Sequence, residues 1–312
     1  MKSAAQPLFI LKSPPATLPL PSRGEGLRVR GEHRRAQTIA DNRHLVCLTH
    51  RMELIIRPDQ DAAAFLVARI VANEVRTNPR TVLGLATGST MEAVYCQLVQ
   101  THRETKLDFS GVRTFNLDEY VGLDSTDPHS YRHFMNEHLF RHVNIDLRNT
   151  HLPNGRATDL GAECRHYEKL IADAGGIDLQ LLGIGKSGHI GFNEPLSALK
   201  SRTREKALTP TTIKQNAPFF GGEGKMPRRA ITMGVGTILD ARRCILLAIG
   251  ESKADIIAQA VEGPITSMVT ASALQLHAKA TVIVDEAAAT KLKEKEYYRW
   301  IFANEPEWEE YR

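Results

Sequence analysis

The chain has 312 residues, of which 42% are hydrophobic, 24% charged and 6% aromatic. This composition is typical of a globular protein and excludes the collagen-like, disulfide-scaffold and wholly disordered classes. The formal net charge of +4 comes from residues 1–51, which hold nine Lys/Arg and three Asp/Glu. The rest of the chain is slightly acidic and has no apolar run of the ~20 residues that a membrane-spanning helix needs. We therefore expect neither a nucleic-acid nor a membrane partner.

Residues 1–51 differ from the rest of the chain in composition. They hold five of the 15 prolines, and a Gly/Arg-rich stretch at 22–35 has no helical or alternating apolar period. Such a segment buries too little apolar surface to offset the entropy of ordering it. The sequence therefore predicts a disordered N-terminal extension over residues 1–51 and one α/β domain over residues 52–312. Met52 is an alternative start of the protein.

Six apolar segments alternate with segments of helical period after Met52. A continuous apolar run bounded by turn residues predicts a buried strand, and apolar residues three and four apart predict a helix. Strands separated by helices in this way indicate an α/β fold with a largely parallel sheet that is covered on both faces. The predicted strands are 53–57, 81–86, 112–117, 177–185, 243–250 and 280–285, and the predicted helices are 59–77, 91–102, 129–142, 158–174 and 252–262.

Ligands of open α/β sheets bind at the carboxyl ends of the strands, so the residues that follow each strand are informative. After strand 81–86 come Thr87, Gly88, Ser89 and Thr90, which lead into a helix. Unpaired N–H groups at a helix N-terminus, together with three hydroxyls, favour a phosphate site. Ordinary helix capping by Ser or Thr is the alternative. The segment matches neither a Walker A loop nor GxGxxG, so a nucleotide is disfavoured.

Two further strand ends carry groups suited to proton transfer. Asp118 and Glu119 follow strand 112–117, where a carboxylate can act as a base or cap the next turn. His189 and Glu194 share the Gly-containing loop after strand 177–185. A carboxylate that binds one imidazole nitrogen fixes the tautomer, while the other nitrogen faces substrate.

The segments GLATGST, FNLDEYVGL, LLGIGKSGHIGFNEP, SRTR and ITMGVGTIL together resemble the glucosamine-6-phosphate deaminase family over about residues 52–285. The resemblance implies a three-layer, Rossmann-like α/β fold and a homo-oligomer. It also implies a hydrolase of amino-sugar catabolism that isomerises and deaminates glucosamine 6-phosphate to fructose 6-phosphate and ammonia. No cofactor is implied.

The resemblance also implies residue roles. Asp118 matches the base that takes the C2 proton of the ring-opened sugar and returns a proton at C1. His189 matches the residue that opens the pyranose ring, and Glu194 matches the carboxylate that orients it. The loop 87–90 matches the surroundings of the substrate phosphate, to which Lys253 adds a positive charge.

Three departures from the family pattern bear on the site. Ser187 stands where some members carry an Asp beside the histidine, so it would support ring opening without a charge. Pro218 stands where members commonly place a phosphate-binding Arg. Ser197, Arg204 and Lys206 fit a regulatory cluster near SRTR, although the neighbouring Ala207 replaces a hydroxyl.

Other interpretations stay open on the sequence alone. The enzyme could prefer galactosamine 6-phosphate, or it could resemble a 6-phosphogluconolactonase. A sugar-phosphate-sensing effector domain is the non-enzymatic alternative, although residues 1–51 show no helix-turn-helix pattern. We expect no metal site, because the histidines at 129, 133, 138 and 142 form two i,i+4 pairs without an HExxH motif. The cysteines at 47, 96, 164 and 244 form no CxxC pair, which favours free thiols in a cytoplasmic protein.

Overall fold

A seven-stranded parallel sheet forms the centre of the structure, a computed structural model that describes residues 51–312. The predicted extension therefore lies outside the described residues, except for Arg51, which begins the first strand. Each strand runs parallel to its neighbours. In spatial order the strands are β1 (Arg51–Arg57), β10 (Lys279–Asp285), β9 (Arg243–Ala248), β6 (Leu179–Leu182), β2 (Val82–Leu85), β3 (Arg113–Asn116) and β5 (Thr150–His151).

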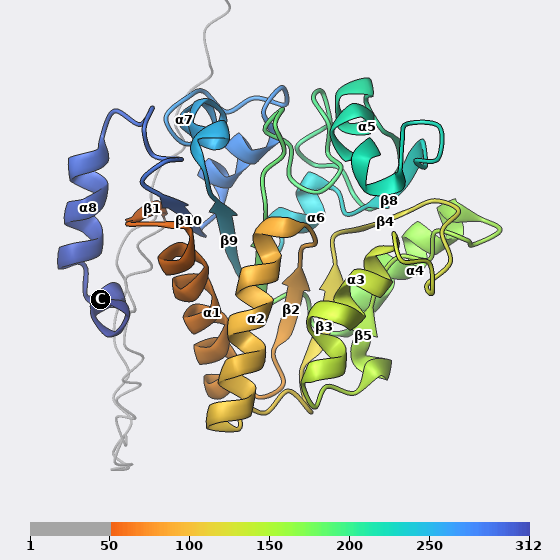
Figure 1. Ribbon diagram of the computed structural model, residues 1–312, viewed down its shortest axis with the longest axis horizontal. Helices are drawn as coiled ribbons and strands as arrows, with labels where there is room; N and C mark the ends of the chain where they lie inside the picture. The colour runs from red at the N-terminus through yellow and green to blue at the C-terminus, as the bar shows by residue number, and fades with distance from the viewer. Residues whose placement is uncertain (1–50) are drawn as a thin grey trace, which may run out of the picture. The chain divides into compact units, whose positions relative to one another are not determined.

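The helices cover both faces of this sheet. From β1 the chain moves through β2 and β3 to β5, and it then returns through β6 and β9 to β10. Because parallel crossovers are right-handed, the reversal places the helices of the outward path on one face and those of the return path on the other. Figure 1 shows α1 and α2 side by side in front of the sheet. The outward helices are α1 (Gln60–Thr77), α2 (Ser89–Thr105) and α3 (Tyr131–His138); the return helices are α4 (Leu160–Asp173), α6 (Val235–Leu239) and α7 (Ala254–Val261); α8 (Lys295–Asn304) packs against β1.

The predicted three-layer α/β fold class is confirmed by this arrangement. The central strands β2 and β6 are buried at every residue, as expected for apolar runs covered on both faces. The predicted helix 129–142 is shorter than expected. It ends at His138 and is followed by a 3-10 turn at Phe140–His142. No helix among residues 51–312 is long and apolar enough to cross a membrane.

A second, antiparallel sheet was not predicted from the sequence. It consists of β4 (Asp118–Tyr120), β8 (Arg229–Thr232) and β7 (Arg204–Ala207), with β8 in the middle. A separate apolar cluster accompanies this sheet and includes Tyr120, Phe192 and Ile213. Ile213 belongs to α5 (Pro210–Asn216), which continues into a 3-10 turn at Ala217–Phe220.

The strand order fixes where a ligand can bind. The neighbouring strands β2 and β6 lead to opposite faces, because β2 continues through α2 whereas β6 belongs to the return path. Such a reversal leaves a crevice at the carboxyl ends of the two strands. The loops at 87–90 and 183–194 follow these two strands, so the segments with the predicted chemistry meet at this crevice.

Candidate active site

A cavity of about 570 Å³ lies at the carboxyl ends of β2 and β6. The loop after β2 contributes residues 87–90 to its wall, and the loop after β6 contributes residues 183–186 and His189. Asp118 lines the cavity from the second sheet, and Thr212 lines it from α5. The cavity therefore lies between the two sheets, where an open α/β sheet binds its ligand.

One end of the cavity is suited to an anion. Gly88 precedes the first residue of α2, and its φ of +114° is a conformation that favours glycine. No side chain caps this helix, so the structure gives no support to the capping interpretation of residues 87–90. The unpaired N–H groups of the first turn are thus available to a ligand in the cavity, as is the positive end of a 17-residue helix.

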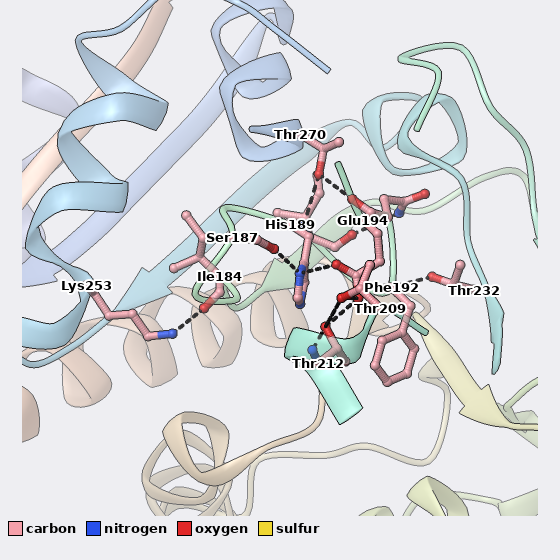
Figure 2. Close-up of polar contacts among 12 residues, drawn as sticks. Ile184, Ser187, His189, Phe192, Glu194, Thr209, Thr212, Thr232, Lys253 and Thr270 are labelled. Atoms are coloured by element: carbon pink, nitrogen blue, oxygen red, sulfur yellow. Dashed lines mark hydrogen bonds and ion pairs between the residues drawn. The ribbon is translucent and has the colours of Figure 1, made fainter. Parts of the chain in front are cut away.

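Lys253 supplies a cation at the same cavity. Its Nζ donates to the carbonyl oxygen of Ile184 at 2.6 Å, and burial together with the nearby Lys186 lowers its pKa (Figure 2). Among the Lys and Arg residues that the structure describes, Lys186 and Lys253 line the cavity. Pro218 is exposed and does not line it.

Asp118 is the first residue of β4, and its side chain is only 7% exposed. Within residues 51–312 no hydrogen bond is recorded to its carboxylate. Burial raises the pKa of Asp118 to about 8, and the neighbouring charge of Glu119 adds to this effect. A carboxylate that titrates close to neutral pH is suited to accept a proton from substrate.

Glu119 has a different role from Asp118, although the two are adjacent in the sequence. One carboxylate oxygen accepts from the backbone N–H of Tyr120 at 2.8 Å and of Tyr131 at 3.1 Å, and the other accepts from Arg132 N at 3.0 Å. Glu119 thereby satisfies N–H groups at the start of α3, and it does not line the cavity. The Asp-Glu pair thus combines a cavity-facing carboxylate with a structural one.

His189 lies in the cavity wall with two partners on one ring nitrogen. Its Nδ1 lies 2.7 Å from Ser187 Oγ and 3.1 Å from Glu194 Oε2 (Figure 2). The ring lies against Gly185, where an added Cβ would come within 2.1 Å of Nε2. With Nδ1 occupied, Nε2 is the nitrogen left to exchange a proton with a ligand.

The second oxygen of Glu194 is held by hydroxyls from the start of α5. Glu194 Oε1 accepts from Thr209 Oγ1 at 3.1 Å and from Thr212 Oγ1. Burial alone would raise the pKa of this carboxyl, but hydrogen bonds from His189, Thr212 and Thr209 outweigh it and lower the pKa to about 2. Glu194 is therefore a buried partner of His189 that is charged near neutral pH.

The three residues of the predicted regulatory cluster lie outside the cavity. Ser197 is buried, and within the described residues its Oγ has no hydrogen-bond partner. Arg204 lies in β7, and its Nη1 donates to Asn193 Oδ1 at 2.9 Å. Lys206 is on the same strand and is partly buried.

Several cavity-lining side chains were not predicted from the sequence. Gln60 reaches the cavity from the start of α1, and Tyr131 reaches it from the start of α3. Gln215, Asn216 and Phe219 come from α5 and the turn after it. The Thr209-Pro210 pair could have indicated this helix, since Thr at the N-cap followed by Pro is a helix-start signal.

Two of the four histidines at 129–142 contact neighbouring polar groups of the protein. His129 Nδ1 lies 2.9 Å from Asp127 Oδ1, and His142 Nε2 lies 2.7 Å from the carbonyl oxygen of Glu137. In the part of the chain that the structure describes, no three His, Cys, Asp or Glu side chains are grouped as a metal site requires.

Relatives of the chain share most of its length. A glucosamine-6-phosphate deaminase of Cellvibrio japonicus is 53% identical over 250 residues, which are 80% of this chain and 95% of the relative. One of Streptomyces coelicolor is 48% identical over 83% of this chain and 99% of its own length. A solved structure described as a monomeric glucosamine-6-phosphate deaminase matches with a TM-score of 0.76 and 44% identity, and covers 77% of this chain and 100% of that one.

More distant structures share the fold alone. A 6-phosphogluconolactonase from Trypanosoma cruzi matches with a TM-score of 0.64 at 20% identity, over 78% of this chain and 98% of that one. At the level of sequence, residues 59–283 match the family described as glucosamine-6-phosphate isomerases/6-phosphogluconolactonase. The resemblance in the sequence motifs is thereby confirmed, and the chain belongs to this family of sugar-phosphate enzymes.

Proposed function

We propose that this enzyme converts glucosamine 6-phosphate and water to fructose 6-phosphate and ammonia. The supporting observation is one cavity that joins an anion-binding loop, a carboxylate with a raised pKa and a histidine–carboxylate pair. The names of its relatives, which are about 50% identical over most of the chain, support the same reaction.

The phosphate binds, in this proposal, at the start of α2. The N–H groups and hydroxyls of residues 87–90 surround it, and Lys253 supplies the charge. Binding at this end holds the sugar with its C1 and C2 toward the other end of the cavity. There Asp118 and His189 can reach the reacting atoms.

His189 opens the pyranose ring. The Glu194 carboxylate keeps a proton on Nδ1, so Nε2 can take the proton from O1 and deliver it to the ring oxygen. The C1–O5 bond breaks and leaves an open-chain aldehyde. Ser187 supports the ring from the same side as Glu194.

Asp118 then carries out the isomerisation. Its carboxylate removes the C2 proton while a proton of the substrate ammonium group passes to O1, which gives an enolamine; the Asp118 acid then returns its proton to C1. The product of this transfer is an imine at C2. Water adds at C2, the carbon–nitrogen bond breaks, and ammonia leaves together with fructose 6-phosphate.

Two assays separate this function from its alternatives. We expect ammonia release from glucosamine 6-phosphate to exceed that from galactosamine 6-phosphate when both are measured side by side. Hydrolysis of 6-phosphogluconolactone should stay at the background rate. Faster turnover of the lactone would favour a lactonase, and binding of the amino sugar without turnover would favour a sensing domain.

Regulation, assembly and location are further parts of the proposal. Ser197, Arg204 and Lys206 form an effector site, and Arg204 connects it to the catalytic loop through Asn193, the residue before Glu194. We propose a homo-oligomer in the cytoplasm that takes part in amino-sugar catabolism. A related solved structure is described as monomeric, so light scattering on the purified protein tests the assembly.

A further inference from the structure

The start of α5 contacts the His189–Glu194 pair through Glu194 Oε1, the carboxylate oxygen that does not face His189. Thr209 is the N-cap residue of α5 and Thr212 lies in its first turn, and both hydroxyls reach Glu194 Oε1. Thr212 is 3% exposed and also lines the cavity. One helix therefore contacts both the space for substrate and the carboxylate that partners His189.

The two hydroxyls contribute unequally to this contact. Thr209 Oγ1 also accepts from the backbone N–H of Thr212 at 3.3 Å and lies 3.2 Å from Thr212 Oγ1, so it acts as the helix cap as well. The Thr209 hydroxyl can donate either to Thr212 Oγ1 or to Glu194 Oε1, whereas Thr212 Oγ1 donates to Glu194 Oε1. Since a hydroxyl has a single proton to donate, Thr212 is the principal donor to Oε1.

Fixing Oε1 also fixes Oε2, because a carboxylate is planar and its two oxygens turn together. In the observed orientation Oε2 lies 3.1 Å from His189 Nδ1, while Ser187 Oγ lies 2.7 Å from the same nitrogen. A carboxylate can only accept, so it places the proton on Nδ1; a serine hydroxyl can donate or accept and specifies no tautomer. With Ser187 in this chain, Glu194 is the partner that determines which nitrogen is basic.

We propose that Thr212 is a positioning residue for ring opening: its hydroxyl orients Glu194 so that His189 keeps its proton on Nδ1 and its basic nitrogen toward the substrate. This inference rests on the proposed function and adds α5 to the machinery of the first step. Without the Thr212 hydroxyl, Glu194 loses a donor and can rotate away, which leaves Nδ1 with the nearer Ser187 hydroxyl and without a charged partner. Ring opening then slows, whereas the phosphate site and Asp118 are untouched.

The test compares Thr212→Val, which keeps the shape and removes the hydroxyl, with Thr212→Ser, which retains a hydroxyl. Thr211→Val is the matched control, because Thr211 lies on the same helix, is exposed and does not line the cavity. The measurements are kcat and KM for ammonia release, and inhibition by 2-amino-2-deoxyglucitol 6-phosphate. This sugar alcohol cannot form a ring, so its affinity reports on the site without the ring-opening step.

We expect Thr212→Val to lower kcat by about tenfold to a hundredfold, as for the loss of a hydrogen bond to a charged group, with KM changed less than threefold. Affinity for the sugar alcohol should be unchanged, Thr212→Ser should recover most of kcat, and Thr211→Val should behave as the unmutated enzyme. If Thr212→Val does not fold, Thr212→Ala replaces it in the comparison with Thr212→Ser.

Three results would overturn the inference. These are an unchanged kcat in the variant that lacks the hydroxyl, an equal loss of kcat and of affinity for the sugar alcohol, and no recovery in Thr212→Ser. The proposed function has a separate test in the same experiment. It fails if the unmutated enzyme releases no ammonia, whereas the role of Thr212 fails with that activity intact.

Discussion

Asp118 and Glu194 are both buried carboxylates, but Asp118 lines the cavity whereas Glu194 contacts it only through His189 and Thr212. Asp118 lies at the start of β4, and in residues 51–312 no hydrogen bond is recorded to its carboxylate; its pKa is raised to about 8. Glu194 lies in the loop after β6 and receives His189 on one oxygen and Thr209 and Thr212 on the other. Its pKa is lowered to about 2.

Burial therefore does not determine the charge of a carboxylate; the donors that accompany burial do. A buried carboxylate without donors holds its proton up to neutral pH and can exchange it with substrate. A buried carboxylate with three hydrogen-bond donors, such as Glu194, stays ionised near neutral pH and serves as a fixed charge. The enzyme thus obtains a base and an electrostatic partner from the same functional group.

The largest expected effect follows from replacing the carboxylate that lacks donors. Asp118→Asn keeps the size of the side chain, so substrate should still bind, but an amide cannot accept the C2 proton. We expect kcat to fall by about 10²–10⁴-fold with KM little changed. Exchange of the C2 hydrogen with solvent, followed by NMR in deuterated water, should stop.

Glu119→Gln provides the comparison for that variant. Glu119 does not line the cavity, so its replacement should leave C2 exchange within about tenfold of the unmutated rate. Exchange at the full rate in Asp118→Asn would show that another group is the base.

Replacing the carboxylate that has donors should have a smaller effect. Glu194→Gln keeps an oxygen for the threonines but removes the charge opposite His189. We expect kcat to fall by roughly a hundredfold, the lower range for acid–base assistance. Binding of the sugar alcohol should be unchanged, because that molecule has no ring to open. Weaker binding of the alcohol would instead indicate a contact between Glu194 and substrate.

Lys253 extends the comparison to a partly buried cation. Within residues 51–312 its ammonium donates to the Ile184 carbonyl and forms no ion pair, so a phosphate would be its main counter-charge. Lys253→Ala should raise KM about tenfold through loss of a charge-assisted contact, with a smaller change in kcat. Lys186→Ala, at an exposed position of the same cavity, should raise KM less. Equal effects of the two variants would mean that both lysines hold the phosphate.

The smallest effect is on stability, and its sign differs between the two carboxylates. The folded-state pKa of Asp118 lies above its unfolded value of 3.8, so the unmutated protein loses stability as the pH rises from about 4 to about 8. Glu194 has the opposite shift, so its contribution is present above its unfolded value of 4.5 and is lost toward about pH 2.

The Tm of each variant relative to the unmutated protein measures this difference. Asp118→Asn should gain a few degrees, as an order of magnitude, between pH 5 and pH 8.5. Glu194→Gln should show no such gain over this range, and its deficit should shrink below pH 4. Parallel Tm curves for the Asp118 variant and the unmutated protein would contradict a raised pKa.

Six of the seven strands of the central sheet could be predicted from the sequence, because each is an apolar run that is recognisable by itself; β5, with only two residues, was not predicted. Residues 81–86 and 177–185 are apolar runs, and burial on both faces is the physical cause of such runs. The chemistry at their ends could be located for the same reason, since parallel strands align their carboxyl ends. His189 and residues 87–90 indeed line one cavity.

The second sheet could not be predicted, because its strands carry little signal of their own. β4 has three residues, and the four residues of β7 are partly or fully exposed. Both pair with β8, which is distant in sequence, so no local pattern records the contact. α5 was not predicted either, because its short sequence PTTIKQN lacks an apolar period.

Asn193 joins segments that are far apart in the chain. Its side-chain Nδ2 donates to the backbone carbonyl oxygens of Ile190 and Met233, and its backbone carbonyl oxygen accepts from Thr270 Oγ1. Arg204 donates to its Oδ1 from β7. Contacts of such high sequence separation form late in folding, because the loops between them must close first. We therefore expect recovery of activity in refolding experiments to follow the slowest phase, after the helical signal has returned.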